Sequence, residues 1–429
     1  MTSRRLTLLA LLAAGTLLVA ACSSDSSTTS SGSSGSGSSN DSAATQAALG
    51  TPKAATLAPV KVGLISSAKA DSPLAGNWQG VEKGVNMMVE YANAYRGGIA
   101  GHTIALDICQ GGVDPSGWQT CANQMVNDNV VAVIEPFNSY ASTVVPVLNG
   151  AKIPYLTLSG AAIEELTTPT GVYSLTGGFP TTLGSIALHA QQQGYKKFAL
   201  IGIDVPAVAQ AVQFIGDPLF QKTGVELQFI AAPVGVADMT PQMQSAISGG
   251  ASAIGVIGDQ TFCASFLNAH KTLGSTLPLY LVATCIDAAT VSTLGPLMNG
   301  QWMVGVSENS PDSPDGKLFG AVAETYGDNV DPNPGADAGV QTGSIVTLTF
   351  ADMLARLTGD PTAATVQATL DAAVKTPLFL GGGATVTCDH TAVPSFPTIC
   401  SPYVLIGTVD AQGQLNDAAV IDTAPLFKP

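Results

Sequence analysis

Six short polar stretches carry the side chains that could do chemistry, and each follows a short apolar run. They are residues 66–78, 135–140, 159–162, 204–208, 258–262 and 283–287. Amides, hydroxyls, carboxylates and aromatic rings in such a mixture are suited to binding a polar solute. The candidate ligand contacts are Trp78, Asn138, Ser139, Tyr140, Ser159, Gly160, Ala161, Ala162, Asp204, Asp259, Gln260, Phe262, Thr284 and Asp287.

Motifs for catalysis are missing from the sequence. There is no G-x-S-x-G elbow, Walker loop or H-E-x-x-H pair, and no G-x-G-x-x-G follows a predicted strand. The four histidines, His102, His189, His270 and His390, lie far apart. We therefore expect no enzyme activity and no cofactor. A hydrolase with a nucleophile in the Ser-rich loops is the remote alternative.

The elements that position these stretches alternate between β-branched strands and longer helices, the pattern of a parallel sheet covered on both faces. In the first half we expect strands at 60–65, 102–109, 130–134 and 153–158. Helices are expected at 78–95, from Asp114-Pro115 onward, and at 141–148.

The same alternation restarts after residue 196, which predicts a second α/β lobe. Strands are expected at 197–204, 225–230, 253–258, 278–282 and 301–306, and helices at 206–220, 240–248, 261–273 and 288–297. Further helices at 317–326, 339–357 and 362–376 precede a closing strand at 403–409. The fold class is α/β, with two Rossmann-like lobes built on parallel sheets.

The six polar stretches all follow strands of these two predicted sheets. Ligands of open α/β sheets bind beyond the carboxyl ends of the strands. Several stretches also run into helix N-termini, where free backbone N–H groups favour an anionic group such as a carboxylate.

The N-terminus has the features of a bacterial lipoprotein leader. Arg4 and Arg5 precede an apolar run from Leu6 to Ala21, and Val19-Ala20-Ala21-Cys22 is typical of a lipobox. Residues 1–21 are therefore expected to be a signal peptide, with lipid attached to Cys22. The alternative is an ordinary secretory signal in which Cys22 is incidental.

A flexible tether is expected between this lipid and the folded body. Residues 23–40 are almost entirely Ser, Gly and Thr, and 41–58 are rich in Ala and Thr. We expect the tether to span 22–57, and no further apolar run reaches membrane-spanning length. The lipid is then the only expected membrane contact, on the outer face of the cell membrane.

Composition excludes one class of partner. The chain has 16 Lys and Arg against 31 Asp and Glu, a formal net charge of −15. Such an acidic body argues against nucleic acid as a partner.

Six cysteines remain after Cys22, and export favours disulfides between them. The sequence does not choose among the many pairings. Local pairing is the simplest: Cys109 with Cys121, Cys263 with Cys285, and Cys388 with Cys400. Zinc is the rival interpretation, but no C-x2-C unit is present, so we expect no metal.

Several of these segments resemble the type I periplasmic binding proteins, in particular the branched-chain amino acid receptor group of ABC importers. Asn93-Ala94-Tyr95-Arg96-Gly97-Gly98-Ile99-Ala100-Gly101 is similar to that family's Asn-x-x-Gly-Gly-Ile-x-Gly turn, with one extra residue. The resemblance extends from about 58 to 410. It also includes Val60 to Leu64, Pro73 to Gly80, Asp114-Pro115, Ala122 to Val126, Ile153-Pro154 and Ser159 to Ala161.

The resemblance implies two discontinuous lobes that close on a ligand about a hinge. The N-terminal lobe would be 58–178 plus about 307–382, and the C-terminal lobe 179–306 plus about 383–429. The three crossovers would lie near 177–184, 304–307 and 380–386. The implied partners are a small solute and the permease subunits of an importer, and the protein would be a monomer.

The resemblance also gives roles to site residues. Asn138 and Ser139 fall where the family has a ligand-binding serine, although either could simply cap a helix. Ala162 falls where the family often has Thr or Ser, so one hydroxyl contact is lost. Trp78 and Tyr140 would form walls of the site, unless they are only packed.

The second lobe departs from the amino acid receptors. No tyrosine is present in 204–208, and Asp287 stands about two residues late for an acid that would meet an ammonium group. A buried ammonium without a partner is costly. Amides, other small polar metabolites and short carboxylates therefore stay open as ligands. A lipoprotein that senses a ligand for a signalling partner is the alternative function.

Overall fold

The structure, a computed structural model, describes residues 37–69, 71, 75–138, 140–204, 206–233, 235–258, 260–286 and 288–428. The predicted signal peptide and Cys22 lie outside these residues. The chain falls into two units, Met1–Asp41 and Ser42–Pro429, and the description below concerns the second. Within the described residues, no helix is long and apolar enough to cross a membrane.

The N-terminal lobe is built on a five-stranded parallel sheet of order β2-β1-β3-β4-β5. The end of its first strand and the three strands between residues 133 and 176 are almost entirely buried, as expected for a sheet covered on both faces, whereas the strand at 102–110 is mostly half-buried. The strands are β1 (Leu57–Ser66), β2 (His102–Gln110), β3 (Val133–Glu135), β4 (Tyr155–Ser159) and β5 (Val172–Thr176). The helices that connect them are α2 (Ala75–Tyr91), η1 (Ala92–Arg96), α3 (Pro115–Asn127), α4 (Ala141–Gly150) and α5 (Ile163–Thr167).

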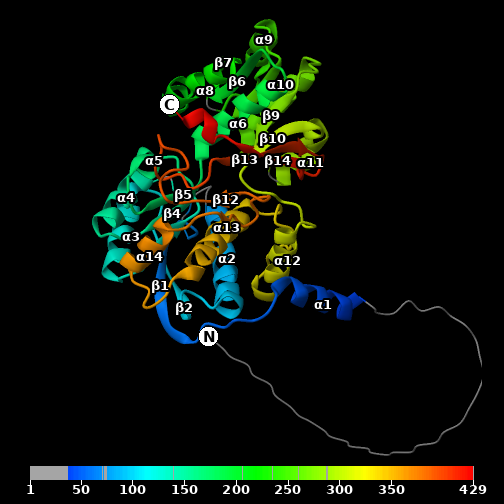
Figure 1. Cartoon of the computed structure of the whole chain (residues 1–429). Helices are drawn as coiled ribbons and strands as arrows, with labels where there is room; N and C mark the ends of the chain where they lie inside the picture. Colours follow the sequence, from blue (N-terminus) through cyan, green and yellow to red (C-terminus); the bar gives the residue numbers. More distant parts are fainter. Residues whose placement is uncertain are drawn as a thin grey trace, which may run out of the picture. The chain divides into compact units, whose positions relative to one another are not determined.

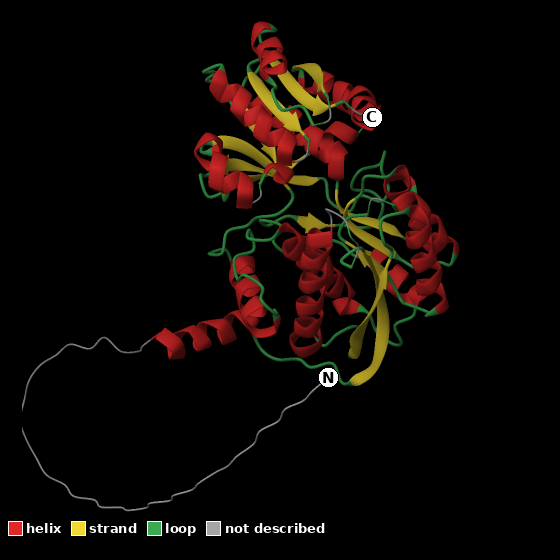
Figure 2. Cartoon of the chain, turned by 180° about the vertical axis from the view of Figure 1, so that it is seen from behind, coloured by secondary structure: helices red, strands yellow, loops and turns green. Residues whose placement is uncertain are grey.

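The C-terminal lobe has a seven-stranded sheet of order β14-β13-β10-β9-β8-β6-β7, in which β13 runs antiparallel to both of its neighbours, β10 and β14. The strands are β6 (Lys197–Ile203), β7 (Glu226–Ala232), β8 (Ala253–Ile257), β9 (Leu279–Val282), β10 (Gln301–Gly305), β13 (Tyr403–Val409) and β14 (Leu415–Asp422). The helices are α6 (Gly178–Gln192), α7 (Pro206–Ala211), η2 (Val212–Gly216), α8 (Asp217–Thr223), α9 (Thr240–Ser248), α10 (Gln260–Thr272), η3 (Ala283–Cys285), α11 (Ala288–Met298) and η5 (Ala424–Phe427). Figure 2 shows helices on both faces of the sheets.

After β10 the chain returns to the N-terminal lobe, and this segment completes its core. The returning elements are α12 (Pro314–Tyr326), α13 (Ala338–Met353), η4 (Leu354–Arg356), α14 (Ala363–Asp371) and the short pair β11 (Thr376–Pro377) and β12 (Thr385–Val386). Figure 1 shows α13, from late in the sequence, beside α2, from its beginning.

Glycines on both helices permit the close approach of α2 and α13. A Cβ atom at Gly84 would lie 2.2 Å from the carbonyl oxygen of Val340, and one at Gly343 would lie 2.6 Å from the carbonyl oxygen of Val81. Asp337 caps α13 by accepting hydrogen bonds from the amides of Gly339 and Val340. Backbone packs directly on backbone at this crossing.

The chain path differs from one of the expected crossovers. It leaves the first sheet after Thr176 at the start of α6, and it leaves the second after Gly305. It does not return near 380–386, because residues up to Cys400 still pair with the N-terminal lobe. Ser174 donates its amide to Thr398 and accepts from the amide of Cys400, both at 2.8 Å.

Other corrections concern individual elements. Four strands were expected in the first sheet, but β5 adds a fifth, and α6 and β14 were also missed. The helix expected to reach 376 ends at Asp371. Part of the expected tether is α1 (Gly37–Leu49), whose Leu49 is buried in the N-terminal core. The carbonyl of Leu49 accepts a hydrogen bond from the hydroxyl of Tyr91, so the body begins before residue 57.

All three local disulfides form, which confirms the simplest pairing. Cys109–Cys121 joins β2 to α3, and Cys263–Cys285 joins α10 to the turn after β9. Cys388–Cys400 closes a loop that touches both cores, since its cysteines lie in the N-terminal cluster while Val393 and Ile399 lie in a C-terminal one.

Removing the Cys263–Cys285 bridge should destabilise the C-terminal lobe. The double variant C263S/C285S is expected to lose about 3 kcal/mol of unfolding free energy, because the bridge restricts the unfolded chain and both cysteines are buried. Chemical denaturation without reductant measures the loss. A reductant should lower the midpoint of the wild type more than that of the variant; equal midpoints without reductant would contradict the prediction.

Candidate functional site

Four aromatic rings gather where β1 and β3 end. The ring of Trp78 lies 5.4 Å from that of Trp118 and 4.6 Å from that of Phe137, and the ring of Trp118 lies 5.5 Å from that of Tyr140. Trp78 is only 2% exposed, so it forms part of the buried side of this cluster, whereas Phe137 and Tyr140 are partly exposed. The sequence interpretation missed Trp118 and Phe137; the adjacency of Phe137 to Asn138 was the available signal.

Beside this cluster, a buried polar network joins the loops that follow β3 and β4. Asn138 donates from Nδ2 to Glu135 Oε2 at 2.5 Å and accepts from the amide of Tyr140 at 2.7 Å. The hydroxyl of Tyr155 donates to Glu165 Oε1 at 2.8 Å and lies 3.5 Å from Glu135 Oε2. Asn138 therefore holds its own loop in shape, but it does not cap α4, whose N-cap residue is Tyr140.

The two carboxyl groups of this network lie in an environment that disfavours negative charge. Burial, and then the nearby carboxylate of Glu165, raise the pKa of Glu135 well above its usual value. Burial also raises the pKa of Glu165, although hydrogen bonds from the amides of Ala161 and Ala162 oppose this. Glu135 Oε1 lies near the backbone of Ile65 but has no well-formed hydrogen bond among the described residues.

The loop after β4 uses most of its own polar groups. The amide of Gly160 donates to the hydroxyl of Ser174 at 2.8 Å, and the hydroxyl of Ser159 pairs with that of Thr176 at 2.5 Å. The amides of Ala161 and Ala162 donate to Glu165 Oε2 at 2.9 and 3.1 Å. The backbone donors expected to meet a ligand are thus engaged within the loop itself.

Two residues missed by the sequence interpretation, Glu135 and Glu165, therefore organise this site. Glu165 is three residues after Ala162, the spacing of a capping box, in which the side chain of the third helical residue accepts from the backbone amide of the residue that caps the helix. That spacing was the available signal. Glu135 ends a buried strand, and nothing else in the sequence marks it.

In the C-terminal lobe, the predicted residues follow β6, β8 and β9, which are neighbours in the sheet. Asp204, Gln260 and Thr284 are exposed, and the hydroxyl of Thr284 donates to the carbonyl of Gly258 at 2.9 Å. Phe262 is buried in the lobe's core. Ser139, Asp259 and Asp287 lie outside the described residues.

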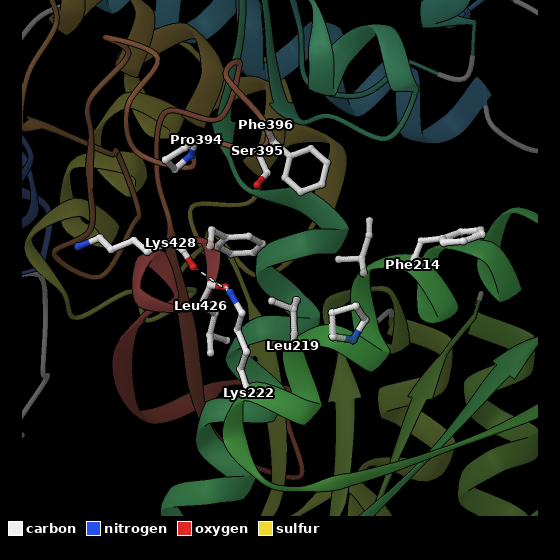
Figure 3. A pocket seen from close by; sticks show the side chains of 11 residues that line it. Phe214, Leu219, Lys222, Pro394, Ser395, Phe396, Leu426 and Lys428 are labelled. Atoms are coloured by element: carbon white, nitrogen blue, oxygen red, sulfur yellow. Dashed lines mark hydrogen bonds between the residues drawn. The ribbon is translucent and has the colours of Figure 1, made fainter.

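A groove of about 460 Å³ lies elsewhere in the C-terminal lobe (Figure 3). Apolar side chains of η2, α8, η5 and the Cys388–Cys400 loop form its walls. Lys222 borders it and donates to the carbonyls of Leu426 and Lys428 at 2.8 and 2.9 Å. None of the predicted ligand contacts lines this groove, so it is separate from the candidate site.

Solved structures share this fold at low sequence identity. An ABC transporter substrate-binding protein from Sphaerobacter thermophilus aligns with a TM-score of 0.68 at 17% identity, over 85% of this chain and 96% of that one. LivJ from Streptococcus pneumoniae, a branched-chain amino acid transporter substrate binding protein in complex with isoleucine, gives 0.64 at 15%, over 85% and 99%. A solute binding protein from R. palustris in complex with 4-hydroxybenzoate gives 0.67 at 18%, over 86% and 98%.

The family comparison is more specific than these likenesses of fold. No curated protein matches the sequence significantly. Residues 59–398, most of the chain, match the family model described as periplasmic binding protein. With its two α/β lobes on parallel sheets and the chain crossing repeatedly between them, the chain belongs to the periplasmic binding protein family.

Proposed function

We propose that this chain is an extracytoplasmic solute-binding lipoprotein that captures a small polar solute between its lobes and delivers it to an ABC importer. The observation that carries the proposal is topological. The chain crosses repeatedly between two sheets, and the polar loops of each follow the carboxyl ends of its parallel strands. The segments that cross between the sheets would act as a hinge, so a solute bound by both sets of loops would stabilise a closed form.

The chemistry of the loops supports a small polar solute with an apolar part. Phe137 and Tyr140 are partly exposed beside the buried Trp78 and Trp118, a surface on which an apolar or aromatic group can pack. Asp204, Gln260 and Thr284 add exposed polar groups from the other lobe. Structural neighbours hold isoleucine and 4-hydroxybenzoate, ligands that combine an apolar part with polar groups.

The lipid anchor is the second part of the proposal, and it rests on Arg4, Arg5 and the residues that lead to Cys22. Mass spectrometry of membrane-extracted protein should give an N-terminus at Cys22 that carries acyl chains. The variant C22A should be released from the membrane. A soluble, unacylated wild-type protein would remove this part without touching the binding role.

The binding role is tested by a thermal-shift screen followed by small-angle X-ray scattering. A solute at about one hundred times its Kd should stabilise the protein by about 2.7 kcal/mol, because it binds only the folded state. The same solute should reduce the radius of gyration as the lobes close. Suitable probes are amino acids, their amides and small aromatic or aliphatic acids. The proposal fails if a solute that stabilises the protein leaves its radius of gyration unchanged.

A further inference from the structure

We propose that Glu165 acts as a built-in carboxylate that excludes acidic groups from the loop after β4, so the solute presents an uncharged polar group there. The inference rests on the proposed function and narrows its solute class. It favours amides and hydroxyl compounds over free carboxylic acids at this end of the site. Glu165 is then a specificity-determining residue.

The first argument is that the donors suited to a carboxylate are already occupied. The amides of Ala161 and Ala162 both point to one oxygen of Glu165, at 2.9 and 3.1 Å. Two adjacent amides converging on one oxygen are the arrangement that binds a carboxylate. The other oxygen of Glu165 accepts from Tyr155 at 2.8 Å, so the side chain is held at both oxygens.

The second argument is that the remaining donors of the loop are also satisfied. The amide of Gly160 is bound by Ser174, and the hydroxyl of Ser159 is paired with that of Thr176. Ala162 has no hydroxyl to offer. An incoming acid would therefore have to displace a buried glutamate that is only 1% exposed, whereas an uncharged group that brings its own donors would not.

The third argument is electrostatic. Glu135 and Glu165 share Tyr155 as a neighbour. Within the described part of the chain, neither carboxyl group is paired with Lys, Arg or His. A solute carboxylate at this loop would add another acidic group to a buried cluster that has no counterion, and burial makes such repulsion strong.

The experiment follows the backbone amide signals of Ala161 and Ala162 by NMR in the isotope-labelled protein during titration with acetate and, separately, acetamide. In the wild type, acetate should leave both signals in place. In E165A the amides are freed, and acetate should bind them at least about tenfold more tightly than in the wild type, the effect of one charge-assisted hydrogen bond.

Two variants separate occupancy of the amides from the loss of charge. E165Q removes the charge but keeps an oxygen that can accept from both amides, so it should not gain acetate binding. E164A removes the charge of the neighbouring, less buried Glu164 and should behave like the wild type. An equal gain in E165Q and E165A would overturn the occupancy argument.

If E165A fails to fold, the wild type alone still tests the inference about Glu165. Acetate-dependent shifts of the Ala161 and Ala162 signals in the wild type would overturn the inference, as would a free acid that binds more tightly than its own amide while shifting these signals. Neither result bears on lobe closure. The proposed function fails by the scattering measurement, so the two failures are distinguishable.

Discussion

Replacing Gly84 with alanine is expected to lower the melting temperature of the N-terminal lobe by roughly 6–12 °C. The new Cβ would lie 2.2 Å from the carbonyl oxygen of Val340 and 2.9 Å from its carbonyl carbon. Both atoms are backbone, so no side chain can rotate away and α2 and α13 must separate. Overpacking of this kind costs about 3 kcal/mol, which corresponds to that shift for a lobe of this size.

The matched control lies on the same helix. Among the described residues, Gly76 has no atom within 4 Å of the position that a Cβ would take, so G76A near the start of α2 should be neutral or slightly stabilising through helix propensity. Tryptophan fluorescence reports mainly on this lobe, since two of the three tryptophans, Trp78 and Trp118, are buried in its core and Trp302 lies in β10. If G84A melted at or above the temperature of G76A, the close contact of α2 with α13 would be wrong.

Replacing Glu135 should lower the stability of the protein when the new residue is alanine, but not when it is glutamine. E135A leaves a cavity and takes the hydrogen-bond acceptor from Asn138, so we expect a loss of about 2–4 kcal/mol. E135Q keeps the shape and an acceptor oxygen while it removes repulsion between Glu135 and Glu165. At neutral pH, E135Q should therefore be as stable as the wild type or more stable.

The pH dependence of the unfolding free energy should show whether the raised pKa of Glu135 causes the difference between E135Q and the wild type. Because burial raises the pKa of Glu135 above its unfolded value, the protonated form favours the folded state. Its contribution is complete below the usual glutamate pKa and is lost as pH rises through the raised pKa. The stability of E135Q relative to the wild type should therefore increase with pH over that range.

Chemical denaturation at several pH values measures this difference, and E164Q is the control, since Glu164 lies outside the buried network. A difference between E135Q and the wild type that does not change with pH would show that Glu135 is charged in the folded protein. The same result for E164Q and E135Q would assign the effect to overall charge.

The sequence predicted the parallel strands well because their signal is local. Runs such as 197–204 and 253–258 are apolar, β-branched and bounded by turns, and they became β6 and β8 nearly unchanged. The strand β5 was missed because Val172 to Thr176 alternates with polar residues, which are buried here by neighbours distant in sequence. Helix α6 was missed because the family resemblance assigned 177–184 to a crossover, and this segment contains glycine and proline, which are unfavourable in helices.

The sequence predicted that two of the candidate loops lie close together, but not how their polar groups pair. Residues 135–140 and 159–162 do lie together, because β3 and β4 are neighbours in the sheet. What the sequence could not reveal is which polar groups satisfy one another. That depends on the network through Tyr155 and Glu165, and no residue pattern distinguishes a free backbone amide from one bound by a side chain.

The segment that ends at Cys400 also covers part of one edge of the five-stranded sheet, where a second copy of the chain could otherwise pair. Strand β5 is at the margin of the five-stranded sheet, and an open strand margin is a template on which another chain can pair and aggregate. Here Thr398 and Cys400 occupy the backbone groups of Ser174, and the bond from Cys400 to Cys388 ties them in place. This pairing covers the middle of the β5 margin, and the disulfide limits how far the covering segment can move away from it.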